Sequence, residues 1–429
     1  MRKPVFACMS VLMALPLVVS GCGTTSASGK GSDSGKITLT IEFQRLSTDD
    51  QWANWMQDNI KLFEQAHPNV TFNVTDNASS NTYLTKVTSQ MAAGTTADIF
   101  EGWTSNRMQE FVNSGRVLDI TSYLKSNATL NSEVMKTVLP ATTFNGKVYG
   151  LPTTLDSEVV FYNKDIFQKY GLQVPKTYND LLNIIKTLKT HNITPISMSN
   201  QESFNGAIPL QMIEERIGGL DSYQGLVDGS IPWTSQPVLQ ASSQIQQLIH
   251  MGAFNANPNS TSSDQSIAAL QAGQAAMYIN GTWDIQQLTG KNMNFGAFNF
   301  PSISGGKGSA NDLIELPNDA LYISSHAKNQ STAEEFLAFC LSKPRQLAEA
   351  KANQLIATNT TLPSGTMSPL AVEVHQLQSA ATGSMFPFDL PLGTNMGEQF
   401  DNATQLLYTG QSPNTVFENF ENLVKSSAN

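Results

Sequence analysis

Ile-Thr-Leu-Thr-Ile at 37–41 opens the stretch of sequence that decides the fold. Its apolar residues alternate with polar ones, which predicts a strand with one buried face. Tryptophans and other apolar residues then recur at helical spacing over 52–63. Apolar residues alternate again over 70–74, return to helical spacing over 84–91, and form a short apolar run at 97–100. This order of strand, helix, strand, helix and strand predicts an α/β protein with an open parallel sheet flanked by helices.

A carboxylate and an indole, Glu101 and Trp103, follow the last of these strands. In open parallel sheets, ligands bind beyond the carboxyl ends of the strands. A carboxylate beside an indole would suit a ligand that has hydroxyl groups and a flat apolar face. We therefore predict that Glu101 and Trp103 bind ligand. The alternative is that Trp103 packs under a helix predicted at 106–113.

A second region of alternating helices and strands follows residue 162. Its predicted helices cover 178–188, 211–217, 238–251 and 266–272, and its predicted strands cover 195–198 and 275–279. The chain has 429 residues, and domains commonly have about 100–200, so two or three domains are expected.

The start of the chain resembles a bacterial secretion signal. It opens Met-Arg-Lys and then runs mostly apolar over 5–19, too short for an ordinary membrane span of about 20 residues. The run ends in Val-Val-Ser-Gly-Cys at 18–22, which resembles the lipobox of bacterial lipoproteins. That resemblance implies a signal peptide at 1–21, lipidation of Cys22 and a flexible tether at 22–36. The alternative is ordinary cleavage nearby, with Cys22 incidental.

The charge of the chain argues against a nucleic-acid partner. It has 25 Lys and Arg against 35 Asp and Glu, a net charge of -10, and phosphate binding needs clustered basic residues. Charged residues make up 14%, against about 25% in an average soluble protein. The polar surface must therefore rely on Asn, Gln, Ser and Thr, which favours an uncharged polar ligand.

Cysteine and histidine give no sign of a metal or cofactor, and we expect neither. Cys8 lies in the signal and Cys22 is the predicted anchor, so Cys340 is alone in the mature chain. It shares a helix face with Phe336 and Leu337, which predicts a buried thiol. The histidines lack metal-ligand spacing; they are His67, His191, His250, His326 and His375.

Four blocks, in this order, resemble the extracellular solute-binding proteins of bacterial ATP-driven sugar importers, the maltose-binding type. Each block combines a short motif with a strand or a helix. They are Gly-Thr-Thr-Ala-Asp-Ile at 94–99; Asn-Gly-Lys-Val-Tyr-Gly-Leu-Pro at 145–152 with Phe-Tyr-Asn-Lys-Asp-Ile-Phe at 161–167 and Pro-Lys-Thr-Tyr at 175–178; Gly-Gln-Ala-Ala-Met at 273–277 leading to Gly-Thr-Trp at 281–283; and a strand at 320–324 with a helix at 331–341.

The resemblance implies a two-lobed periplasmic-binding-protein fold with hinge strands between the lobes. One lobe would hold 37–157 plus 296–342, and the other 158–295 plus 343–429. An oligosaccharide would be captured in the cleft by hinge closure and delivered to the permease subunits of an ABC importer. We expect a monomer, exported and lipid-anchored at the outer face of the cytoplasmic membrane, or periplasmic in a cell with two membranes.

The resemblance also singles out binding residues. Asp156 stands where the maltose-binding type carries a sugar-binding carboxylate, and the alternative is a solvated turn. Trp283 stands where the family places a stacking indole. Beside it, Asp284 either binds ligand or occupies a first helical turn.

The remaining binding predictions are residues of the kinds that a sugar needs. They are Trp233, Phe386 and Asp389, and the resemblance adds Glu202 and Phe204, which stand where the maltose-binding type carries polar and aromatic contacts. Tyr83 fits the cleft and the core equally well, while the helical spacing of Trp52 and Trp55 predicts the core.

Two other classes of function stay open at the level of sequence. A lipid-anchored glycoside hydrolase would need two carboxylates about one bond, drawn from Glu101, Asp156, Glu202 and Asp284. A surface adhesin would bind carbohydrate without an importer. Closing lobes suit capture better than hydrolysis, so binding without turnover is the prediction.

Overall fold

The computed structural model describes residues 35–45, 50–77, 80–134, 138–290, 293–354 and 365–427. The described residues from Ile37 onward belong to one compact unit, which we call the second unit because it follows the first 36 residues of the chain. The predicted signal peptide, the lipidation site at Cys22 and nearly all of the predicted tether lie outside the described residues.

A single sheet of nine strands runs through the described part of the second unit, in the order β2-β1-β3-β10-β6-β8-β7, with β11 beside β10 and β9 beside β6. Strand β1 pairs in parallel with β2 and β3, which confirms the predicted parallel arrangement. A hairpin of β4 and β5 stands apart. The strands are β1 Ile37–Gln44, β2 Val70–Asn77, β3 Ile99–Gly102, β4 Thr143–Phe144, β5 Lys147–Val148, β6 Gly150–Asn163, β7 Thr194–Ser197, β8 Ala275–Gly281, β9 Phe295–Phe298, β10 Asp312–Ile323 and β11 Gly383–Met385.

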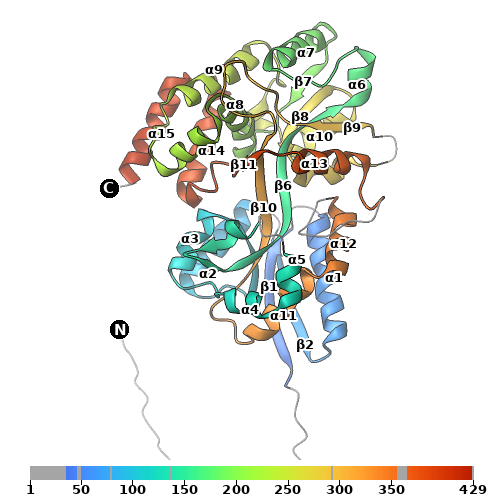
Figure 1. The fold of residues 1–429 in the computed structure, drawn as a ribbon, viewed down its shortest axis with the longest axis vertical. Helices are drawn as coiled ribbons and strands as arrows, with labels where there is room; N and C mark the ends of the chain where they lie inside the picture. The colour runs from blue at the N-terminus through green and yellow to red at the C-terminus, as the bar shows by residue number, and fades with distance from the viewer. Residues whose placement is uncertain are drawn as a thin grey trace, which may run out of the picture. The chain divides into compact units, whose positions relative to one another are not determined.

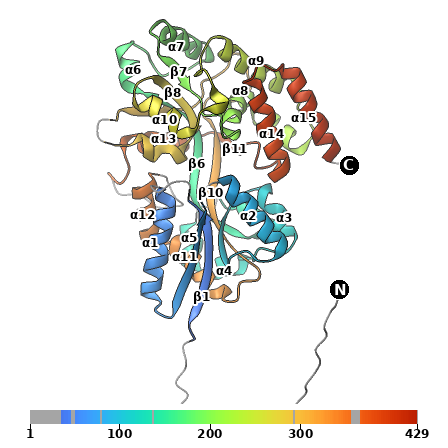
Figure 2. The same ribbon diagram turned by 180° about the vertical axis from the view of Figure 1, so that it is seen from behind.

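The helices form two groups, one at each end of this sheet (Figures 1 and 2). We call the group around β1–β3 the first lobe; its helices are α1 Gln51–Ala66, α2 Ser80–Ala93, α3 Asn106–Asn113, α4 Thr121–Ser126, α5 Ala128–Glu133, η1 Leu139–Thr142, α11 Gln330–Cys340 and α12 Lys343–Asn353. The group around β7–β9 is the second lobe; its helices are α6 Lys164–Lys169, α7 Tyr178–Thr190, α8 Phe204–Asp228, α9 Gln236–His250, η2 Pro258–Ser260, α10 Ser263–Gln271, η3 Thr282–Leu288, α13 Pro369–Ser379, α14 Gly393–Leu407 and α15 Pro413–Ser427.

Strands β6 and β10 belong to both lobes. They lie side by side and run from one group of helices to the other (Figure 1). Their antiparallel register extends from Gly150 opposite Tyr322 to Glu158 opposite Ile314. Because these two long strands pass between the lobes, they are the hinge strands that the two-lobed fold requires.

The core of the first lobe is aromatic. Trp52 and Trp55 are buried, as predicted, and the Trp55 indole donates a hydrogen bond of 2.9 Å to the carbonyl of Arg345. Cys340 is fully buried, as its helical spacing predicts. Tyr83 is fully buried too, with its hydroxyl bonded to the carbonyls of Glu42 and Glu101, so it is a core residue.

The core of the second lobe draws on segments far apart in the sequence. Its largest cluster joins Ile213 of α8, Met277 of β8 and Phe400 of α14. The boundaries of the lobes stay a prediction, but two segments pack with the other lobe from the one predicted for them. Phe298 of β9 lies in the second lobe's cluster, and α12 packs on α1 of the first lobe.

Candidate functional site

An aromatic pair lies where β8 and β7 end, at the edge of the second lobe. Trp283 is the second residue after β8, and its ring lies against Gly281, since a Cβ atom there would sit 2.0 Å from the indole. Phe204, the first residue of α8, meets the indole edge-on, with ring centroids 6.2 Å apart. Phe204 is 39% exposed and Trp283 is half-buried, so both rings have surface to offer.

Asp284 lies behind this pair and does not reach the surface. Its carboxylate accepts hydrogen bonds from the Tyr278 hydroxyl at 2.7 Å and the Asn280 amide at 2.8 Å. Burial raises the pKa of Asp284 to about 7. The side chain is buried in a network that fixes the turn carrying Trp283, and direct contact of Asp284 with a ligand stays a prediction.

Asp156 lies on hinge strand β6 and is also fully buried. It accepts a hydrogen bond of 2.9 Å from the Thr282 hydroxyl, and that hydroxyl in turn accepts one from the backbone N–H of Ser157. Burial raises the pKa of Asp156 to about 6. The structure therefore places Asp156 next to the Trp283 turn, linked to it through Thr282, instead of in a solvated turn.

Glu101 and Trp103 lie at the carboxyl end of β3, as the sequence predicted. The Glu101 carboxylate is buried and accepts hydrogen bonds from the backbone and side-chain amides of Gln44, which joins the ends of β1 and β3. The half-buried Trp103 ring packs on Tyr83, with centroids 5.7 Å apart. Glu202 is exposed in the loop just before Phe204, near the aromatic pair in sequence.

Trp233 packs in the core of the second lobe, and this position gives no support to the prediction that it binds sugar. It is only 2% exposed and packs against Phe388, Phe400 and Phe420, each with a ring centroid about 5 Å away. Its backbone N–H donates to the Glu421 carboxylate at 2.7 Å. A side chain enclosed on these sides has no face left for a ligand.

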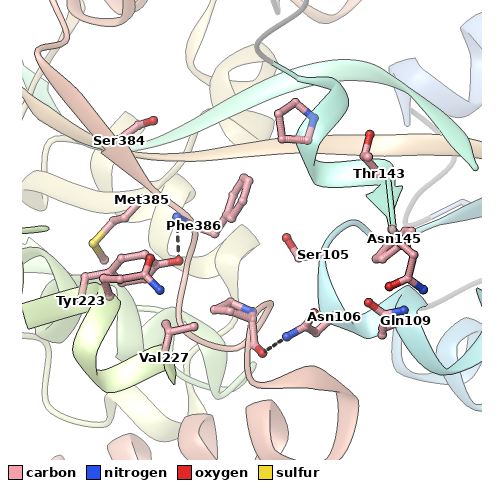
Figure 3. A pocket seen from close by; sticks show the side chains of 14 residues that line it. Ser105, Asn106, Gln109, Thr143, Asn145, Tyr223, Val227, Ser384, Met385 and Phe386 are labelled. Atoms are coloured by element: carbon pink, nitrogen blue, oxygen red, sulfur yellow. Dashed lines mark hydrogen bonds between the residues drawn. The ribbon is translucent and has the colours of Figure 1, made fainter. Parts of the chain in front are cut away.

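Phe386 lines a cavity of about 420 Å³ whose walls come from both lobes (Figure 3). Ligand pockets commonly measure about 300–1,000 Å³, so this volume lies in the lower part of that range. The lining contains no Asp, Glu, Lys, Arg or His, and it mixes rings with hydroxyl and amide groups. The main ones are Ser105, Asn106 and Gln109 from the first lobe and Tyr223, Gln224 and Phe386 from the second. The Phe386 backbone N–H donates to the Tyr223 hydroxyl at 3.3 Å.

Asp389 faces the first lobe instead of open solvent. Its carboxylate forms an ion pair of 2.7 Å with the guanidinium of Arg107 on α3. The neighbouring Asn106 side chain donates to the carbonyl of Pro391 at 2.6 Å, drawn as a dashed line in Figure 3. Sequence reasoning missed Arg107 and Asn106, although both lie in the helix predicted at 106–113, directly after the Trp103 loop.

Within the described residues, no helix is long and apolar enough to cross a membrane. No cluster of three or more His, Cys, Asp or Glu side chains suited to a metal ion occurs in that same part of the chain.

Comparison with known proteins gives consistent results. The chain is 26% identical to the melibiose/raffinose/stachyose-binding protein of Bacillus subtilis, over 82% of this chain and 79% of that protein. It is 24% identical to the multiple sugar-binding protein of Streptococcus mutans, over 75% of each. A solved structure of a chitin oligosaccharide binding protein superimposes with a TM-score of 0.83 at 23% identity, covering 91% of this chain and 98% of that one.

The shared fold confirms the predicted two-lobed α/β class. Residues 49–347 match the family of bacterial extracellular solute-binding proteins, which is most of the chain. This protein is a member of that family.

Proposed function

We propose that the protein captures an oligosaccharide between its two lobes and delivers it to the permease subunits of an ABC importer. The observation that carries this proposal is the lining of the junction between the lobes, which combines aromatic rings with uncharged hydrogen-bonding groups and is free of Lys and Arg in the cavity. The names of the relatives in Bacillus subtilis and Streptococcus mutans, both sugar-binding proteins, support it.

The chemistry of a sugar explains why such a lining suits it. A pyranose ring offers hydroxyl groups around its rim and C–H groups on its faces, so it needs hydrogen-bonding groups and aromatic surfaces together. Trp283 and Phe204 supply rings at the second lobe, Trp103 supplies one at the first, and Phe386 supplies one in the cavity. Glu202 supplies a carboxylate in the loop before Phe204. Asn106 and Gln109 supply side-chain amides from helix α3 in the cavity wall.

Hinge strands β6 and β10 provide the movement that capture requires. Small changes of backbone angle in two connecting strands can rotate one lobe against the other. We propose that closing around the sugar presents a surface that the permease recognises. Lipidation at Cys22 would hold the protein at the outer face of the membrane, near that permease.

The glycoside hydrolase alternative finds little support in the arrangement of acids. Hydrolysis requires two carboxyl groups that flank one glycosidic bond. Asp156, Asp284 and Glu101 are buried and accept hydrogen bonds from the protein. Of the four acids considered, Glu202 is the exposed one. This arrangement favours binding over turnover.

Titration with neutral oligosaccharides tests the proposal. Tryptophan fluorescence should show saturable binding of at least one sugar from a panel including raffinose, xylotriose, chitotriose and maltotriose, with Kd near or below about 1 μM, and chromatography should recover the sugar unchanged. A sugar phosphate serves as the control and should bind poorly, because the cavity offers no cation to pair with it. Recovery of shortened sugars at catalytic rates, or no binding across the panel, would contradict the proposal.

A further inference from the structure

Helix α3 of the first lobe is joined to residues 386–392 of the second by two hydrogen-bonded contacts. Arg107 pairs with Asp389, and Asn106 bonds to the carbonyl of Pro391. Asn106 and Pro391 both line the cavity, so this contact forms part of the cavity wall (Figure 3). If the lobes separated, this contact would break and the cavity would open at the same time.

Hydrogen bonds join the second lobe's side of the contact to hinge strand β6. Gln211 of α8 donates to both oxygens of Glu158 on β6, at 2.9 and 2.7 Å. The carbonyl oxygen of the same amide accepts a hydrogen bond of 3.1 Å from the backbone N–H of Phe388. A continuous path of hydrogen bonds therefore runs from the hinge strand to the residue next to Asp389.

Arg107 places a cation of the first lobe beside an acidic region of the second. Besides Asp389, this region contains the buried carboxyl groups of Glu158 and Asp401. Burial raises the pKa of both groups, and the nearby Asp389 raises each pKa further. Burial raises the pKa of Asp401, and the nearby Arg107 guanidinium opposes that rise. Removing Arg107 would leave this region without the cation contributed by the other lobe.

We propose that Arg107 and Asp389 form a latch across the cleft, which raises the affinity for sugar by favouring the closed relation of the lobes before sugar arrives. This proposal rests on the proposed function. The side chains are 14% and 15% exposed, so their ion pair is shielded from water better than an ordinary surface pair. A ligand binds more tightly when the competent conformation is already populated, because apparent affinity scales with that population.

The latch predicts specific effects of Arg107→Gln and Asp389→Asn. Each variant should raise the Kd for the best sugar by about three- to tenfold. In the absence of sugar, X-ray scattering should give a larger radius of gyration than for the wild type, and saturating sugar should restore the wild-type value. The double variant should be no worse than the more impaired single variant, since both changes break the same pair. Arg107→Lys should recover part of the affinity.

The ion pair between Lys164 and Glu373 provides the matched control, because both residues belong to the second lobe. Lys164→Gln should leave the radius of gyration and the Kd at wild-type values. The latch is refuted if Arg107→Gln and Asp389→Asn, shown by circular dichroism to be folded, keep the wild-type radius of gyration without sugar, or if their effects on Kd add. If the wild type binds no sugar, the proposed function fails, while the scattering comparison still tests the latch.

Discussion

Two tryptophans that look alike in sequence lie in different surroundings in the structure. Trp283 is half-buried beside the exposed Phe204, whereas Trp233 is enclosed by three phenylalanines. Trp283→Ala should weaken sugar binding by about tenfold or more, since aromatic anchors dominate binding energy, and should leave thermal unfolding of the free protein nearly unchanged. Trp233→Ala, the matched control, should lower the free energy of unfolding by about 3–5 kcal/mol. Fluorescence titration measures the affinity of both variants for sugar, and urea unfolding measures their stability. A large loss of stability in Trp283→Ala with intact affinity would assign Trp283 to the core.

Helix α8 links the two areas of the candidate site. It begins at Phe204, beside Trp283, and carries Tyr223 to the cavity after a kink at Gly219. Gly219 has φ 72° and ψ 178°, a conformation that is open almost only to glycine. The kink redirects the helix so that one element contributes to both areas.

Gly219→Ala should therefore destabilise the protein. The strained backbone should lower the free energy of unfolding by about 1–3 kcal/mol, measured by urea unfolding. The new Cβ would also lie 3.3 Å from the Cβ of Lys307. Gly290→Ala is the control, because its added Cβ would make an ordinary contact of 3.5 Å with the Met293 sulfur, and its effect should stay within about 0.5 kcal/mol. Equal effects of the two substitutions would argue against strain at Gly219.

The elements that local patterns predicted well are those with one buried face. The alternation at 37–41 and the helical spacing at 52–63 correspond to β1 and α1. Helix α8 was predicted only over 211–217, since it is buried on almost every side and contains Pro209, so it has neither a clear amphipathic period nor an uninterrupted helical sequence.

The candidate site was predictable where position along a strand determines it. Trp103 does lie at a strand end, as the rule for open sheets predicts, and Trp283, predicted from the family resemblance, follows the end of β8. Burial of Trp233 could not be inferred, because it depends on segments distant in the sequence, such as the helices that carry Phe400 and Phe420. The ion pair between Arg107 and Asp389 was not predicted for the same reason, since 282 positions separate the two residues.

At the scale of the whole molecule, buried acids make stability depend on pH. Burial raises the pKa of Asp156 to about 6 and of Asp284 and Glu214 to about 7. These groups ionise near pH 4 in the unfolded chain, so the folded state holds more protons between about pH 4 and pH 7. The free energy of unfolding contributed by these groups therefore falls as pH rises through that range.

Asp284→Asn should remove one part of this dependence. The asparagine oxygen can still accept from Tyr278 or Asn280, but it carries no charge at high pH. Between pH 5 and pH 8 the wild type should lose about 1–3 kcal/mol more stability than the variant, measured by urea unfolding at each pH. If the free energy of unfolding depended on pH in the same way in both proteins, the pKa of Asp284 would not be raised by folding.

The shared strand β10 also governs how the chain must fold. It lies between β3 and β6 in the sheet, yet it is made late, after all but β11 of the strands described here. The first lobe is therefore missing a central strand until residue 323 is available, and the second lobe waits still longer for α14 and α15. Contacts of such long sequence separation slow folding. Neither lobe can therefore complete its sheet or its core before these later segments have been synthesised.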